Sequence, residues 1–176
     1  MATVTTTTYS STTDTTAITC TLASLATSAT LVAGRESTVV DNTSNLYLDA
    51  QVFGQITVGT TPTVDKSIQI WAYTPIKIAT STKTYPLATT TALTGVDAAA
   101  TFEAKQLNQL HLLEQISVIA TSDRAYSFFI GSLASAFGGV LPSWWGIFVT
   151  HDTAVNLNAT AGNHWIHYTG IKVTHT

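Results

Sequence analysis

An alternation of apolar and polar side chains, with a period of two residues, most constrains how this 176-residue chain can fold. It is clearest over residues 46–58. One side carries Leu46, Leu48, Ala50, Val52, Ile56 and Val58, and the other carries Tyr47, Asp49, Gln51, Gln55 and Thr57. Successive side chains of a β-strand point to opposite faces, so the pattern predicts a strand with one buried face. At Gly54 we expect a β-bulge or a close approach of another backbone.

Seven further segments have strand character and are separated by turn-forming residues: 17–26, 37–41, 66–73, 113–121, 126–131, 144–150 and 165–174. About eight short strands predict an all-β, two-layer antiparallel sandwich, and their number favours a jelly roll. The short loop after residue 58 predicts that 46–58 and 66–73 pair as a hairpin, with Ile68 and Ile70 facing inward. Only 97–111 has a helical period, so there we expect either a helix or irregular structure.

The composition describes one domain with an unusual surface. About one residue in five is Thr, a residue whose branched Cβ favours extended backbone. Only 10% of the residues are charged, against roughly 25% in ordinary soluble domains. The net charge of −3 is not that of a basic protein that attracts nucleic acid or an anionic membrane, so we expect neither as a partner. Such a surface suits a protein that is largely covered by other proteins, and it is also compatible with a monomer that carries few charges.

Residues 1–16 are almost entirely Thr and Ser and cannot bury apolar area. We therefore divide the chain into an extended arm, 1–16, and a single sandwich domain, 17–176. We expect the arm to lie on another chain, with Thr5, Thr6, Thr7, Thr8 and Tyr9 as interface residues. The N-terminus lacks the basic and apolar regions of a signal peptide. We accordingly expect a protein made and used in a cytosol-like compartment, or released by lysis.

The sequence nominates no catalytic residue, no metal ligand and no cofactor site. His164 and His167 are three residues apart on a predicted strand, which sends them to opposite faces and away from a shared metal ion. The acids are scattered singly, and Asp41 stands beside a turn where Asp bonds its own backbone. Cys20, the single cysteine, is expected to pack beside Ile18 and Leu22 as a small hydrophobe. We therefore predict a protein that is not an enzyme.

Aromatic residues are the remaining functional signal. In 144–150 we expect Trp145, Ile147 and Val149 to face inward, which leaves Trp144 and Phe148 outward. Together with Trp71 and Phe137, Trp144 is a candidate interface residue. Exposed aromatic rings can anchor a protein interface or stack on a sugar, and the alternative is that they form core on the second face of a sheet.

Two stretches resemble a family of tailed-bacteriophage structural proteins. The first runs from Ser135-Ala136-Phe137-Gly138-Gly139-Val140-Leu141-Pro142 through Trp145-Gly146-Ile147-Phe148-Val149 to the turns His151-Asp152-Thr153 and Ala161-Gly162-Asn163. The second is residues 35–49, with Val39-Val40-Asp41-Asn42 at its centre. Together they cover under half of the chain, and the motifs are structural. Ala154 stands where the family has a Gly, so that loop departs from its pattern.

The resemblance implies a jelly-roll cement or decoration protein on the outside of a virion capsid, assembled in the host cytoplasm. Its partners would be the major capsid protein and copies of itself, as a dimer or trimer. The resemblance carries over no catalytic residues. Two alternatives remain open: a carbohydrate-binding or receptor-binding sandwich module, and a neck or tail adaptor.

Overall fold

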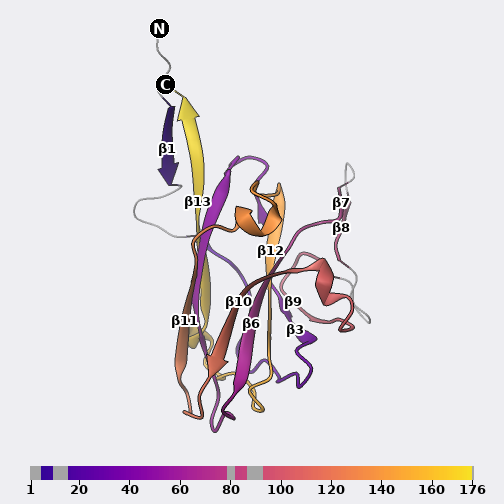
Figure 1. Cartoon of the computed structure of the whole chain (residues 1–176), viewed down its shortest axis with the longest axis vertical. Helices are drawn as coiled ribbons and strands as arrows, with labels where there is room; N and C mark the ends of the chain where they lie inside the picture. Colours follow the sequence, from indigo (N-terminus) through magenta and orange to yellow (C-terminus); the bar gives the residue numbers. More distant parts are fainter. Residues whose placement is uncertain (1–4, 10–15, 79–81, 87–92, 176) are drawn as a thin grey trace.

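The structure is a computed structural model that describes residues 5–9, 16–78, 82–86 and 93–175 (Figure 1). The elements in chain order are β1 (Thr5–Tyr9), β2 (Thr16–Ala17), β3 (Ala33–Glu36), β4 (Val40–Asp41), β5 (Asp49–Thr57), β6 (Lys66–Tyr73), β7 (Lys77–Ile78), β8 (Lys83–Thr84), β9 (Ala98–Thr101), η1 (Leu107–Gln109), β10 (His111–Val118), β11 (Ala125–Ile130), η2 (Ala134–Phe137), β12 (Trp144–His151), η3 (Ala161–Asn163) and β13 (Trp165–His175). The fold is all-β, as predicted.

Two antiparallel sheets with jelly-roll connections form the sandwich, and β7 and β8 pair with each other as a separate two-stranded sheet. The first sheet has the order β1-β13-β5-β11, with β2 also beside β13, and the second has the order β10-β6-β12-β3-β9, with β4 also beside β12. If β1/β2 and β3/β4 each count as one interrupted strand, and β7, β8 and β9 are left out of the count, the first sheet contains strands one, eight, three and six. The second contains two, seven, four and five. This alternation between layers is the double Greek key of a jelly roll.

The main core fills the space between the sheets. The first sheet contributes Ala50, Val52 and Ile56 from β5, and the second contributes Ile68 and Ile70 from β6. Trp145, Ile147 and Val149 of β12 lie in the same core with no exposed surface, as the alternation predicted. Burial of such side chains stabilises the fold by roughly 1.5–3 kcal/mol each.

A second core lies on the outer face of the second sheet. The described residues between β6 and β10 fold back over this face and bury an apolar cluster made of Tyr73, Tyr85, Leu93, Ala100, Phe102, Leu110 and Phe148. Phe148 therefore points outward from the sandwich, as predicted, but it has no exposed surface because Phe102 packs against it with ring centroids 5.1 Å apart. We refer to the described residues of this covering segment, 74–78, 82–86 and 93–110, as the flap.

Pairing partners were predicted less well than strand positions. The expected hairpin of 46–58 and 66–73 is wrong, because β5 pairs with β13 and β11 whereas β6 pairs with β10 and β12. The loop between β5 and β6 crosses from one sheet to the other. Both strands direct their apolar side chains into the same core, so the alternation cannot distinguish a hairpin from such a crossing.

Two predicted strands take a different form. Within 17–26 only Ala17 belongs to a strand, although Ile18 and Leu22 are buried as expected. Of segment 37–41 only Val40–Asp41 form a strand, β4, because β3 has already ended at Glu36. Both β3 and β4 pair with β12, in registers that differ by one residue. The break follows from Ser37, whose hydroxyl accepts the Ile147 N–H in place of a backbone carbonyl.

The region 97–111 contains no α-helix in the structure. It forms β9, a 3-10 turn at η1 and the start of β10. Strand pairing prevails here because β9 extends the second sheet beside β3, and the Phe102 N–H donates to the Val32 carbonyl oxygen. That placement buries Phe102 against the second core, a gain that the weak helical preference of an Ala-rich segment does not match.

Gly54 is a close approach of two backbones and not a bulge. The register runs through it without a shift, with Phe128 on one side and Ile166 on the other. A Cβ at this position would lie 2.5 Å from the Trp165 carbonyl oxygen and 2.7 Å from the Phe128 ring. A side chain larger than hydrogen would therefore force β13 away from β5.

The described part of the predicted arm lies on the chain's own sheet. Thr5–Tyr9 form β1, which pairs with Ile171–His175 of β13. The pairing of β13 with β5 ends at Ile171 and Asp49, so this end of β13 and β1 rise beyond the sandwich as a two-stranded ribbon (Figure 1). The predicted contact of the arm with another chain stays a prediction. Residues 1–4 and 10–15 of the arm lie outside the described residues.

Candidate functional site

The outer face of the first sheet carries four ring side chains from three neighbouring strands. Phe129 of β11 is the cross-strand partner of Phe53 in β5, and Phe53 is the partner of His167 in β13. Trp165 stands two residues before His167 on the same face. Ring centroids are 6.4 Å apart for Phe53 and Trp165, and 5.3 Å apart for Trp165 and His167. We call these four residues the aromatic row.

The aromatic row is open to solvent over much of its area. Phe129 is 61% exposed and Trp165 is 39% exposed, while Phe53 and His167 are half-buried. Buried rings contribute up to 150–250 Å² each to a core or an interface, so exposed rings at this density mark a surface suited to association.

The face around the row carries almost no charge. The outward positions of its three strands are Gln51, Phe53 and Gln55 in β5, Ala125, Ser127 and Phe129 in β11, and Trp165, His167, Thr169, Ile171 and Val173 in β13. Asp49, at the start of β5, is the charged exception. Its carboxylate accepts the N–H groups of Ala50 and Ala134 at 2.7 and 2.8 Å, so it serves the local backbone.

The rings of the row are steeply inclined to one another. The planes of Phe53 and Trp165 meet at 77°, those of Phe53 and His167 at 54°, and those of Trp165 and His167 at 67°. Edge-to-face packing of this kind is favourable between aromatic rings. It does not produce the coplanar platform on which successive sugar rings stack.

The predicted interface aromatics Trp71 and Phe137 are not gathered into one surface. Trp71 is half-buried against the second core, and its indole N–H is buried with no hydrogen-bond acceptor among the described residues. Phe137, on η2, is half-buried against the main core, with its ring centroid 4.9 Å from that of His111. Trp71 thus lies beside the flap, and Phe137 packs at the edge of the sandwich.

The third predicted aromatic, Trp144, faces outward and is also half-buried. The ammonium of Lys83 lies 3.5 Å from the centre of its ring, a cation–π contact made by the β7–β8 pair. Of the predicted arm residues, Thr5, Thr6, Thr7, Thr8 and Tyr9 all lie in β1, and Tyr9 is 54% exposed.

Sequence reasoning missed the aromatic row, although one signal for it is present. Phe53 falls on the otherwise polar side of the 46–58 alternation, where an aromatic residue is out of place. Phe129 and Trp165 lie more than 70 residues further along the chain, and only the strand order brings them beside Phe53.

A second surface feature is an apolar tip at the start of β5. Leu46, Leu48 and Val140 are 70%, 53% and 68% exposed and line a pocket of about 330 Å³. The expectation that Leu46 and Leu48 face the core is wrong, because they lie before the first residue of β5. The buried side chain of Asn42 fixes this turn by donating to the Tyr47 carbonyl oxygen and accepting the Tyr47 N–H.

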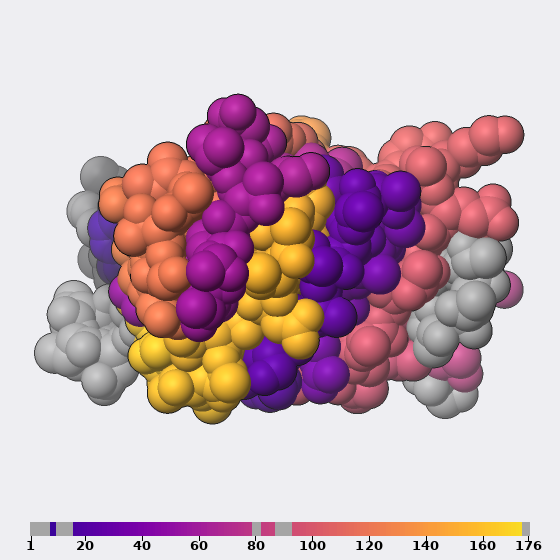
Figure 2. All heavy atoms as spheres, turned by 90° about the horizontal axis from the view of Figure 1, so that it is seen from below, coloured from indigo at the N-terminus to yellow at the C-terminus, as the bar shows by residue number. Residues whose placement is uncertain are grey.

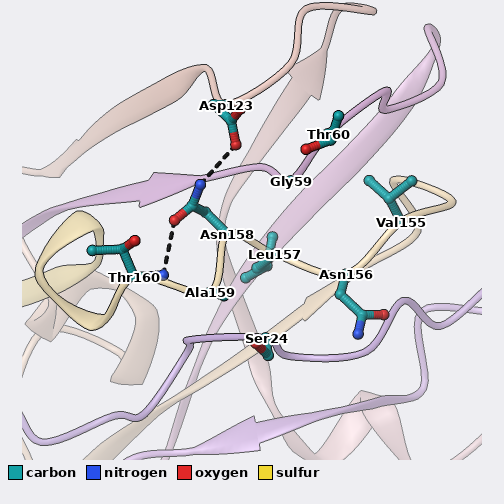
Figure 3. Close-up of a pocket in the computed structure, with 10 residues that line it drawn as sticks. All are labelled: Ser24, Gly59, Thr60, Asp123, Val155, Asn156, Leu157, Asn158, Ala159 and Thr160. Atoms are coloured by element: carbon teal, nitrogen blue, oxygen red, sulfur yellow. Dashed lines mark hydrogen bonds between the residues drawn. The ribbon is translucent and has the colours of Figure 1, made fainter.

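Loops meet at the lower end of the sandwich, which Figure 2 shows from below. A pocket of about 370 Å³ opens there between the loop after β5, the turn at Asp123 and residues 155–160 (Figure 3). At its centre Asn158 donates to the Asp123 carboxylate at 2.7 Å and accepts the Thr160 N–H at 2.9 Å. The amide of Asn158 is therefore committed to holding the loops together.

His164 links the same loops to the end of β5 through two hydrogen bonds. Its Nδ1 accepts the Thr57 N–H at 3.3 Å, so its Nε2 carries the proton and donates to the Asn158 carbonyl oxygen at 2.8 Å. Burial lowers the pKa of His164, which keeps the ring neutral in this arrangement. His167 lies on the outer face, so the two histidines point to opposite sides as predicted.

The ionisable groups with defined partners have structural roles. Glu36 is fully buried, and its carboxylate accepts the N–H groups of Thr94 and Gly95 and the hydroxyls of Thr94 and Tyr73. Burial and the Glu36 charge raise the pKa of the Tyr73 hydroxyl. Cys20 is a half-buried free thiol packed against the main core, and burial raises its pKa.

Asp97 ties the flap to the body. Its carboxylate lies 2.6 Å from Nε of Arg35 and accepts the Thr21 N–H at 3.0 Å. Burial alone would raise the pKa of Asp97, but the hydrogen bonds from Arg35 and Thr21 outweigh it and lower the pKa to about 2. Among the described residues, no cluster of three or more His, Cys, Asp or Glu side chains is placed to hold a metal ion.

In the described parts of the chain, no helix has the length and hydrophobicity needed to cross a bilayer. No protein-family model, curated protein or solved structure matches this chain, so the resemblance to phage structural proteins stays a prediction.

Proposed function

We propose that this chain is a non-enzymatic virion structural protein that binds the outside of a bacteriophage capsid and stabilises it by bridging coat subunits. The observation that carries the proposal is the aromatic row, which lies on a nearly uncharged sheet face that no segment of the described residues covers. The row lies on the rigid strands β5, β11 and β13, so little conformational entropy is lost when a partner covers it.

The scarcity of charge favours apolar docking over ion pairing. The chain has 7 Lys and Arg and 10 Asp and Glu in all, and Arg35 and Asp97 already pair with each other. Exposed ion pairs contribute only about 0–1 kcal/mol each and weaken with salt. Apolar burial, at roughly 25 cal/mol per Å², acts over a standard interface of about 800 Å² per partner. Phe129 and Trp165 are its expected anchors.

A jelly roll with an outstretched ribbon suits a shell component. The ribbon of β1 and β13 extends beyond the body, where it is placed to reach a neighbouring subunit. The apolar tip of Leu46, Leu48 and Val140 supplies a second contact near the start of β5. Together with the aromatic row, this tip gives the small domain two separate contacts, and each can hold a different coat subunit.

A carbohydrate-binding module is the second candidate, since exposed Trp and Phe also bind sugars. The inclination of the rings in the row, 54° to 77°, argues against a stacking platform. The lower-end pocket is polar, but Asn158 at its centre is already hydrogen-bonded to the protein's own groups. We therefore place protein docking ahead of sugar binding.

The test uses particles of the parent phage stripped of this protein. Adding the protein back should raise the temperature of capsid rupture at both low and molar NaCl, because apolar contacts survive salt. Phe129→Ala and Trp165→Ala should each weaken particle binding by at least ~10-fold, the cost of about 1.4 kcal/mol for a truncated anchor. Leu112→Ala is the matched control, because Leu112 is an exposed apolar residue of the second sheet.

Three results would contradict the proposal. The first is no effect of added protein on rupture. The second is binding that disappears with moderate salt, which would indicate ionic contacts. The third is equal loss of binding in the Leu112→Ala control and in the row variants. Absence of particle binding combined with retention on a glycan array would move the carbohydrate alternative ahead.

A further inference from the structure

Within the part of the chain that the structure describes, the ribbon has an unpaired hydrogen-bonding edge. β1 is the last strand of its sheet, and among the described residues its neighbour is β13 alone. Beyond Ile171 the ribbon is only two strands wide and projects from the body (Figure 1). Two-stranded sheets without a packed face are at best marginally stable in water, so a further strand would stabilise this one.

The backbone groups on that edge can be identified from the pairing. The Ile18 N–H donates to the Ile166 carbonyl oxygen, so Ile166 directs its backbone groups toward β2. Alternation along β13 then directs those of Lys172 and Thr174 toward β1, and the Thr8 hydroxyl indeed donates to the Lys172 carbonyl oxygen at 3.4 Å.

It follows which residues of β1 face away from β13. Thr8 and Thr6 pair with Lys172 and Thr174 and share ladder hydrogen bonds with them. Thr5, Thr7 and Tyr9 therefore direct their N–H and C=O groups toward the open edge. These three residues offer three N–H donors and three C=O acceptors to a strand of another chain.

The edge fits a second copy of itself. Natural edge strands are commonly protected by Lys or other charges, which would repel each other across a two-fold axis. β1 has the sequence Thr-Thr-Thr-Thr-Tyr and contains no charge, so two copies can meet without repulsion. Antiparallel pairing of identical strands is also the simplest two-fold interface, because one surface complements itself.

We propose that two copies of this chain associate through the open edges of their β1 strands, in antiparallel pairing, to form a four-stranded β13-β1-β1-β13 ribbon. This association does not require the aromatic row, which stays open on each copy. It therefore stands or falls independently of the proposed capsid function.

The experiment compares purified full-length protein with two variants by sedimentation analysis, without particles. Thr7→Pro removes an N–H from the open edge but none from the β1–β13 ladder, and proline is tolerated at such an edge position. Thr7→Ala keeps the N–H and is the matched control. The wild type and Thr7→Ala should sediment as dimers, and the mass of Thr7→Pro should fall by half.

Amide hydrogen exchange supplies a second measurement with a distinctive pattern. Protection of the Thr7 and Tyr9 amides should rise with protein concentration, whereas the Thr6 and Thr8 amides should be protected at every concentration. In Thr7→Pro, retained protection of Thr6 and Thr8 shows that β1 still pairs with β13.

A wild type that stays monomeric from micromolar to millimolar concentration would overturn the proposal. So would a dimer that persists in Thr7→Pro with Thr6 and Thr8 protected, because another surface would then hold it. Phe129→Ala should dimerise like the wild type, which separates this result from the test of capsid binding.

Discussion

The outer faces of the two sheets differ, because one is covered by another segment of the chain and the other is exposed. On the second sheet, the flap covers Phe148 and Tyr73 and builds a second core. On the first sheet, Phe53, Phe129 and Trp165 stand in a comparable row, but no described segment covers them. Apolar side chains on the outer faces of this jelly roll are thus either buried by another segment of the same chain or left exposed for a partner.

The polar contacts follow the same division. Two acids, Glu36 and Asp97, hold the flap against the second sheet through Thr94, Gly95 and Arg35. On the first sheet the outward positions between Asp49 and the ribbon are uncharged, so they offer no comparable anchor for a loop. The comparison predicts that equivalent truncations on the two faces differ sharply in their cost to stability.

The largest effect is expected for Phe148→Ala. Phe148 is fully buried and packs edge-to-face on Phe102, so truncation leaves a cavity under the flap. The free energy of unfolding should fall by about 3–5 kcal/mol, as measured by denaturant titration. A loss below about 1 kcal/mol would mean that the flap does not form a real second core.

Glu36→Gln should cause the next largest loss in the free energy of unfolding. The carboxylate accepts hydrogen bonds from Thr94, Gly95 and Tyr73, and the amide of a Gln would place a donor against one of these donors. The expected loss is about 2–3 kcal/mol, with faster exchange of the Thr94 and Gly95 amides. Thr74→Ala is the control, because its hydroxyl donates to the Trp144 carbonyl oxygen and leaves Glu36 untouched. Unchanged exchange of the two amides would contradict the anchoring role of Glu36.

The link between Asp97 and Arg35 should give the flap a pH dependence. The pKa of Asp97 is about 2 in the folded protein, against 3.8 as the ordinary value, so the folded state binds a proton less readily than the unfolded state. The stability it contributes is complete above pH 3.8 and is lost as the pH falls toward 2. Its magnitude is on the order of 2 kcal/mol.

Asp97→Asn tests this assignment. The variant should be less stable than the wild type at neutral pH, and the difference between the two should shrink as the pH falls from about 4 to about 2. Denaturant midpoints measured across this range report the difference. A gap that stays constant with pH would assign the acid sensitivity to other groups.

Strand positions were readable from the sequence because burial of one face imposes a period of two. Ala50, Val52 and Ile56 illustrate this, as do Trp145, Ile147 and Val149. Neighbour relations were not readable. Phe53 meets Phe129 and His167 only because β5 lies between β11 and β13, and alternation within one strand carries no information about its neighbours.

The same limit explains the errors around the flap. Ala98–Thr101 has a helical composition, but β3 offers it an unpaired edge and Phe148 offers Phe102 a buried partner. Tertiary contacts decided the structure where local preference was weak. Trp71 was predicted to lie at an interface for a related reason. Its position on β6 faces outward from the sandwich, and the sequence alone does not show that the flap lies beside it.

The smallest effect on stability is expected for Phe129→Ala, and it is the most informative about the comparison. Phe129 is 61% exposed, and its cross-strand contact with Phe53 is worth roughly 0.2–1 kcal/mol. The free energy of unfolding should therefore change by less than about 1 kcal/mol, whereas binding to particles should weaken at least ~10-fold. Ser127→Ala, on the same face of β11, should change neither quantity measurably. A large loss of stability in Phe129→Ala would instead show that the row stabilises the fold. The aromatic residues of the two faces would then have the same structural role despite their different exposure.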